Sequence, residues 1–159
     1  MTSPSSSWQR KALAMAGLLL AGASQADSVP SPQFKPHMQE CGSCHMAYQP
    51  GLLPATSWQR LLSNLPRHFG TDASVDAQTL RALQAWFETQ AGTFKKVTRQ
   101  PAPPPQDRIT RSAWFEREHR GLPAGVWVRP SIRSAAQCTA CHAGAETGQF
   151  SEHQVRVPS

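Results

Sequence analysis

The stretch Cys41-Gly42-Ser43-Cys44-His45 organises this chain, and it recurs in altered form as Cys138-Thr139-Ala140-Cys141-His142. C-x-x-C-H is the attachment signature of c-type haem, in which two thiols bond to the porphyrin vinyl groups and the adjacent His ligates the iron. A lone C-x-x-C pair would also fit a redox dithiol, a zinc site or a disulfide. Here all four cysteines lie in two such pairs, each followed at once by His. The sequence therefore predicts two c-type haems, one held by Cys41, Cys44 and His45 and the other by Cys138, Cys141 and His142.

The first residues have the composition of an export signal. Arg10 and Lys11 precede an apolar run over 12–23, and Ala23-Ser24-Gln25-Ala26 forms an A-x-A-like cleavage site. The run is too short to span a bilayer, which needs about 20 residues. We expect a signal peptide over 1–26 that is cut near Ala26, a periplasmic location, and no stable membrane insertion afterwards. An uncleaved N-terminal anchor is the alternative.

The charge of the exported part indicates which classes of binding partner to expect. Without Arg10 and Lys11, 14 basic residues remain against 10 acidic ones. Four haem propionates could cancel most of this excess, so the working molecule is less basic than its composition suggests. Nucleic-acid binding is excluded, because the arginines of the second half lack aromatic interleaving or a recognised module. Propionate pairing and electrostatic steering of an acidic redox partner explain these arginines better.

A proline-rich segment divides the exported chain. The run Gln-Pro-Ala-Pro-Pro-Pro at 100–105 predicts a polyproline-II-like connector. We take 98–106 as the linker between a haem 1 domain over 27–97 and a haem 2 domain over 107–159. The expected fold is mainly α, with a helical haem domain followed by a smaller, irregular one.

Local patterns predict the elements of the first domain. Residues 27–40 are rich in Pro and Ser and predict an extended lead-in. Ser57 is a plausible N-cap of a short helix that carries Trp58 and ends before Pro66. Asp72 or Ser74 would cap a second helix that ends near Gly92 and whose apolar face contains Leu80, Leu83 and Phe87. Tyr48 is expected to hydrogen-bond a propionate or the backbone.

The second domain has weaker patterns. A short helix is predicted through Trp114, Phe115 and His119, and another over 134–142 carries the second attachment motif. The apolar residues 126–128 would form a short strand or a wall against haem.

The sixth iron ligand decides the function, because Met raises the potential, His lowers it, and an empty position allows gas binding or peroxide chemistry. Met38 and Met46 are the methionines left after cleavage, and both lie too close to the first motif to reach the distal side of its haem easily. Neither is excluded from reaching the other haem. His residues outside the motifs are therefore the candidates.

Four His residues could serve as distal ligands. His68 lies 23 residues after His45, on a loop between two predicted helices that would enclose the haem. His119 follows the aromatic pair at 114–115 and is the candidate for haem 2, with His153 as its competitor. His37 is expected to be a surface residue. Ligation of both irons by two His residues is the favoured interpretation.

At this point the sequence resembles the bacterial dihaem cytochromes c first described from purple photosynthetic bacteria. The resemblance rests on C-G-S-C-H-M-A-Y-Q-P-x-L-L-P-A-x-S-W at 41–58, H-F-G-x-D-A at 68–73, W-F-x-R-E-H-R at 114–120 and A-C-H-x-G-A-x-x-G-x-F at 140–150. It implies bis-His haems, with His45 and His68 on one iron and His142 and His119 on the other. It also implies an N-terminal domain similar to a small mitochondrial-type cytochrome c. The resemblance also implies a role: the protein would receive electrons from membrane cytochromes and donate them to a small oxygen-binding haem protein.

The predicted function is that of a periplasmic electron carrier and not of an enzyme, since two imidazoles per iron leave no open position. One alternative is an electron-transfer subunit of a larger periplasmic oxidoreductase. A dihaem peroxidase or a gas-binding protein is the other, and either would need an open haem site.

Overall fold

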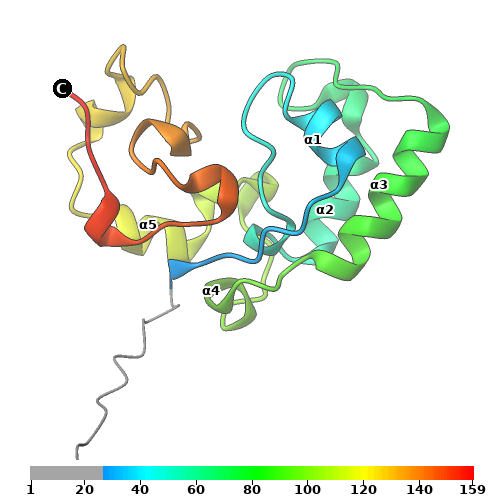
Figure 1. Cartoon of the computed structure of the whole chain (residues 1–159), viewed down its shortest axis with the longest axis horizontal. Helices are drawn as coiled ribbons and strands as arrows, with labels where there is room; N and C mark the ends of the chain where they lie inside the picture. The colour runs from blue at the N-terminus through cyan, green and yellow to red at the C-terminus, as the bar shows by residue number, and fades with distance from the viewer. Residues whose placement is uncertain (1–26) are drawn as a thin grey trace, which may run out of the picture.

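The structure is a computed structural model that describes residues 27–159, and within this range the protein contains five α-helices joined by loops and 3₁₀ turns (Figure 1). The predicted signal peptide over 1–26 lies outside the described residues. The helices are α1 (Lys35–Cys41), α2 (Ala55–Leu62), α3 (Ala77–Gln90), α4 (Lys95–Thr98) and α5 (Ala113–His119). Among these residues, β-structure is limited to isolated bridges. The mainly α fold class is therefore confirmed. None of the helices in 27–159 is long and apolar enough to cross a membrane.

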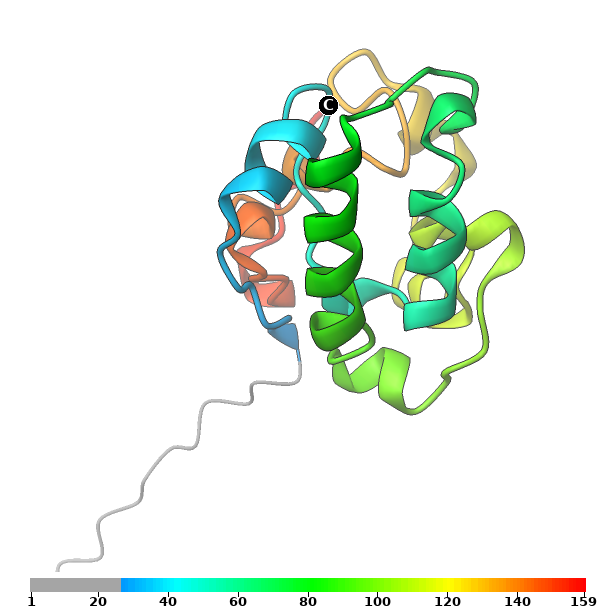
Figure 2. The ribbon, with the colours of Figure 1, turned by 90° about the vertical axis from the view of Figure 1, so that its right-hand side faces the viewer.

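The first half is built around α3, which packs against both α1 and α2 (Figure 2). Leu83 and Phe87 on the inner face of α3 are almost fully buried, as their helical spacing predicts. Trp58 of α2 packs on the Phe87 ring with the centroids 4.3 Å apart, and its indole N–H donates to the Pro50 carbonyl at 2.8 Å. These contacts tie the loop that precedes α2 to the α2–α3 pair.

The helix caps differ from the prediction. Ser57 is fully buried inside α2, whose N-cap is Pro54. Asp76 caps α3 through hydrogen bonds from the backbone N–H groups of Gln78 and Thr79, at 2.9 and 3.0 Å. Asp72 instead accepts from the N–H of Ser74 in the preceding turn. Several good capping residues follow one another here, and the side chain nearest the first helical turn forms the cap.

The lead-in to the first attachment motif is also not extended throughout. Pro36 lies in the first turn of α1, where proline is well tolerated because its missing N–H would have no helical partner. The helix turns His37 inward, where it is only 3% exposed. Its ring lies 4.7 Å from that of Trp86 and 5.2 Å from that of Phe87. The expectation of a surface His37 was therefore wrong.

The two halves of the chain share a hydrophobic cluster. Val29, Leu52, Phe94 and Val97 of the first half pack together with Trp114 and Phe115 of α5. The Tyr48 hydroxyl donates to the Ala136 carbonyl at 2.6 Å, which is the backbone partner expected for this side chain. The first described residues run beside the C-terminal half (Figure 1), with the Val29 N–H donating to the Gly148 carbonyl at 2.8 Å. The division into domains at 98–106 stays a prediction.

Gly148 allows this close approach of the two segments. Its φ of +76° is a conformation that L side chains rarely adopt, and a Cβ here would collide with the Val29 carbonyl oxygen. We expect Gly148→Ala to lower the free energy of unfolding by about 1–3 kcal/mol. Thermal unfolding of the haem-loaded protein measures this loss. Gly121→Ala is the control, because a Cβ at Gly121 meets nothing within 4 Å; equal effects of both substitutions would contradict the role of Gly148.

The second half is irregular apart from α5, which matches its prediction. Residues 126–128 belong to a 3₁₀ turn, Ala124–Val128, and not to a strand; Val126 is buried and Val128 is 78% exposed. The predicted helix over 134–142 is reduced to one 3₁₀ turn, Cys138–Ala140. Short segments with little apolar surface cannot support longer helices here.

Candidate haem sites

The first candidate site lies where the loop after α1 meets the loop between α2 and α3. His45 ends the first attachment motif, and His68 follows the 3₁₀ turn Leu65–Arg67. Their ring centroids are 6.2 Å apart with an interplanar angle of 31°. Two imidazoles on opposite sides of one metal, each with a metal–nitrogen distance of about 2 Å, would place their ring centroids about 6.3 Å apart. The first His pair therefore fits one iron.

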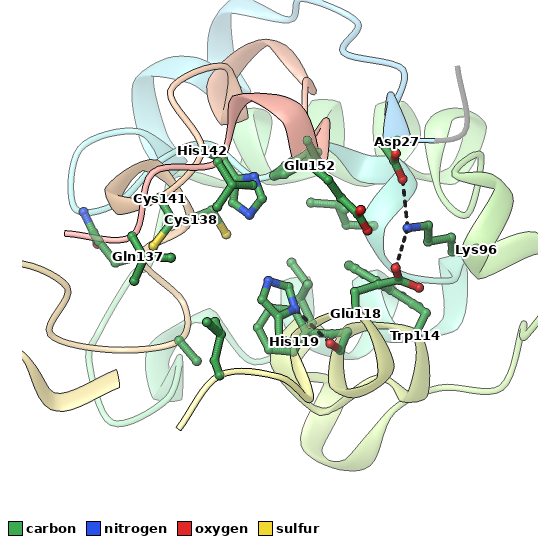
Figure 3. A pocket seen from close by; sticks show the side chains of 18 of the residues that line it. Asp27, Lys96, Trp114, Glu118, His119, Gln137, Cys138, Cys141, His142 and Glu152 are labelled. Atoms are coloured by element: carbon green, nitrogen blue, oxygen red, sulfur yellow. Dashed lines mark hydrogen bonds and ion pairs between the residues drawn. The ribbon is translucent and has the colours of Figure 1, made fainter. Parts of the chain in front are cut away.

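The second candidate site pairs His119, the last residue of α5, with His142 of the second motif. Their ring centroids are also 6.2 Å apart, with an interplanar angle of 78°. The two rings face each other across a cavity of about 290 Å³, with Cys138 and Cys141 at one end (Figure 3). Both histidine pairs thus have the spacing that a bis-His iron requires, although they lie far apart in sequence.

Aromatic side chains shape the wall of the second cavity. The Phe115 ring stacks on the His119 imidazole at 4.0 Å, and the Phe150 ring lies 5.3 Å from that of His142. Trp114 and Trp127 also line the cavity. A flat apolar macrocycle matches this lining, since an apolar cavity favours apolar ligand surface.

Hydrogen bonds orient two of the four imidazoles. The Nδ1 of His119 lies 2.8 Å from the Phe115 carbonyl oxygen, and the Nδ1 of His45 lies 2.7 Å from the Met46 carbonyl oxygen. A carbonyl partner requires the proton on Nδ1, which leaves Nε2 as the nitrogen that can bind a metal. The backbone thus selects the ligating tautomer at both sites.

Burial shifts the pKa values of four site residues toward their neutral forms. It lowers the pKa of His68 and that of His142, with a further contribution from the neighbouring His of each pair. Burial also raises the pKa of Cys41 and of Cys138 to about 11. Neutral imidazoles are the metal-binding form, whereas a thiol with a raised pKa is a poor metal ligand.

The two other candidate ligands lie elsewhere. His153 is exposed on the 3₁₀ turn Glu152–Gln154 and does not line the cavity, although its neighbour Glu152 does. His37 packs between aromatic rings of α3. Between His119 and His153, the geometry favours His119 as the group opposite His142.

A polar cluster at the second cavity was missed from the sequence. The Lys96 ammonium lies 3.0 Å from the Asp27 carboxylate and 3.2 Å from that of Glu118, and all three residues line the cavity. Three separate segments contribute these residues, so no local motif marks them.

Comparisons with known proteins identify the family to which the chain is similar. The profile of the family described as Dihaem cytochrome c matches residues 37–150. A dihaem cytochrome c from Shewanella baltica OS155 is 37% identical with a TM-score of 0.69, and the match covers 80% of this chain and 95% of that one. A dihaem cytochrome c from Rhodobacter sphaeroides is 34% identical with a TM-score of 0.67, covering 77% of this chain and 99% of that one. A comparison with curated proteins gives no match.

The fold and the paired attachment motifs define a c-type cytochrome with two haems, an electron-transfer haem protein. More narrowly, the chain belongs to the dihaem cytochrome c family. Both the predicted family and the predicted cofactors, two c-type haems with iron, are thereby confirmed.

Proposed function

We propose that this protein is a periplasmic electron carrier with two closed, bis-His, low-spin haems, and that it is not an enzyme. Haem 1 is attached to Cys41 and Cys44, with His45 and His68 as axial ligands. Haem 2 is attached to Cys138 and Cys141, with His142 and His119 as axial ligands. The observation that carries the proposal is the 6.2 Å separation of the ring centroids in both histidine pairs.

Each haem supplies a one-electron Fe(III)/Fe(II) couple, and the protein supplies binding, orientation and electrostatics. The backbone carbonyls of Phe115 and Met46 hold His119 and His45 in one orientation. Imidazoles fixed in this way need little rearrangement when the iron changes its charge, which suits rapid electron transfer. With both axial positions taken by His, a substrate or a gas has no position at which to bind.

The two haems would sit in two domains, 27–97 and 107–159, joined by the linker 98–106. Electrons could then enter at one haem and leave from the other. Redox proteins are the expected partners, namely membrane cytochromes as donors and a small oxygen-binding haem protein as acceptor. The signal peptide over 1–26 would bring the chain to the periplasm, where c-type haems are attached.

Absorption spectra of the haem-loaded protein test the closed sites. We expect low-spin spectra in the oxidised and the reduced form, and no change when carbon monoxide is added to the reduced protein. Two strong imidazole ligands per iron produce this result. A substantial carbon monoxide shift would contradict the proposal and indicate an open or labile site, as in a gas-binding protein or a peroxidase.

A further inference from the structure

The second cavity has two chemically different ends. Figure 3 shows Cys138 and Cys141 at one end, the His119 and His142 rings on opposite sides of the cavity, and the Lys96 cluster at the far end. In c-type haem the vinyl groups and the propionates lie on opposite edges of the porphyrin. Attachment of the vinyl edge to the two cysteines therefore directs the propionate edge toward the Lys96 cluster.

The far end holds a buried donor that has no acceptor. Trp114 is 8% exposed and lines the cavity, and its indole N–H has no hydrogen-bond partner among residues 27–159. A buried donor without a partner costs about 1–3 kcal/mol. A negatively charged oxygen at this end of the cavity would satisfy it.

Lys96 is the second donor at this end. Its ammonium has three N–H donors, and the contacts to Asp27 and Glu118 account for two of them. Its side chain is only 17% exposed. Among the described residues that line the cavity, Lys96 is the one Lys or Arg. The two carboxylates hold the ammonium beside the cavity, with one N–H left for a further acceptor.

We propose that Lys96 and Trp114 form the propionate-binding site of haem 2, with Asp27 and Glu118 as positioning residues for the Lys96 ammonium. The inference rests on the proposed attachment of haem 2 to Cys138 and Cys141. It also gives Lys96 a specific electrostatic role. Its positive charge would offset part of the negative charge that the Asp27, Glu118 and Glu152 carboxylates and a propionate place at this end of the cavity, and so would favour the reduced state of haem 2.

Redox titration of the haem-loaded variants, with a spectroscopic signal for each haem, tests this assignment. We expect Lys96→Met to raise the ratio of oxidised to reduced haem 2 by about tenfold at a given potential. This is the size of the effect that one unit charge has across a porphyrin at an effective dielectric constant of about 20. Tenfold is 59 mV for a one-electron couple, here toward more negative potential. Trp114→Phe should shift haem 2 in the same direction by less. In both variants the resonance Raman bands of the propionates should change at one haem.

Two further variants separate a charge effect from a structural one. Lys95→Met is the matched control, since Lys95 is the exposed neighbour in α4 and does not line the cavity. Asp27→Asn breaks the same ion pair as Lys96→Met but removes a negative charge, so the haem 2 potential should become more positive. If the ion pair had only a structural role, Lys96→Met and Asp27→Asn would both weaken it. The haem 2 potential would then not shift in opposite directions in the two variants.

The proposal is overturned if Lys96→Met and Trp114→Phe leave the haem 2 potential and the propionate bands as they are in the wild type, whatever their effect on thermal stability. Failure of the proposed axial ligands has a different signature. It would appear in the wild-type protein as carbon monoxide binding, whereas failure of the propionate site leaves two closed haems with unchanged potentials.

Discussion

Replacing His119 by Ala should convert haem 2 from low-spin to high-spin and open it to carbon monoxide, while haem 1 stays closed. The His119 ring faces His142 at a centroid distance of 6.2 Å, and the Phe115 carbonyl selects its tautomer. Alanine offers no ligand atom, so the iron would lose its sixth ligand. Carbon monoxide difference spectra of the reduced variant should show a response from about half of the total haem, since one of two sites opens.

His153→Ala is the matched control, because His153 is the other histidine of the C-terminal half outside the attachment motif. It is exposed and does not line the cavity, so both haems should remain closed. His68→Ala should open haem 1 in the same way as His119→Ala opens haem 2. Opening of haem 2 by His153→Ala, with no effect of His119→Ala, would show that the assignment of the second axial ligand is wrong.

The features that the sequence predicts well are local ones. The C-x-x-C-H motif places two thiols and an imidazole within five residues, so it specifies haem attachment without knowledge of the fold. The apolar face of α3 follows from the spacing of Leu83 and Phe87, and both side chains are buried. The short helix that presents His119 also forms as its pattern predicts. In each case the decisive residues lie within one or two helical turns.

Features that depend on distant contacts were mispredicted or missed. His37 is preceded by Pro36 and reads as part of an extended segment, yet Trp86 and Phe87 of α3 bury it. The Lys96 cluster joins the N-terminal segment, α4 and α5. No local spacing relates such residues, because only the packing of the two halves brings them together.

The burial of His37 leads to a pH dependence of stability. Burial is the main cause that lowers the pKa of His37 to about 4, from 6.5 in an exposed chain, and it outweighs a hydrogen bond to the Tyr48 backbone that acts in the opposite direction. Its Nδ1 has no hydrogen-bond partner among the described residues, and its neighbours Trp86 and Phe87 offer no counter-charge. The folded protein therefore keeps His37 neutral at a pH at which the unfolded chain already protonates it.

As pH falls from about 6.5 to about 4, the unfolded state binds the extra proton and the free energy of unfolding decreases. The contribution of neutral His37 is fully present above pH 6.5, and protonation of the unfolded chain removes up to about 3 kcal/mol of it at pH 4. We expect His37→Phe, which keeps an aromatic ring among aromatic neighbours, to make the stability of the haem-loaded protein less sensitive to pH in this window. The measurement is the free energy of unfolding by denaturant at several pH values, compared between the variant and the wild type.

Comparing the two proteins cancels the titration of all groups that they share, including the histidines proposed as axial ligands. His153→Phe is the control, because it removes an exposed histidine. Its effect on the pH dependence of stability shows what the loss of an imidazole does when that imidazole is not buried. Parallel stability curves for wild type and His37→Phe between pH 6.5 and 4 would mean that the folded protein does not hold the pKa of His37 below its ordinary value. A difference that widens as pH falls supports a histidine held neutral in the packing of α1 on α3.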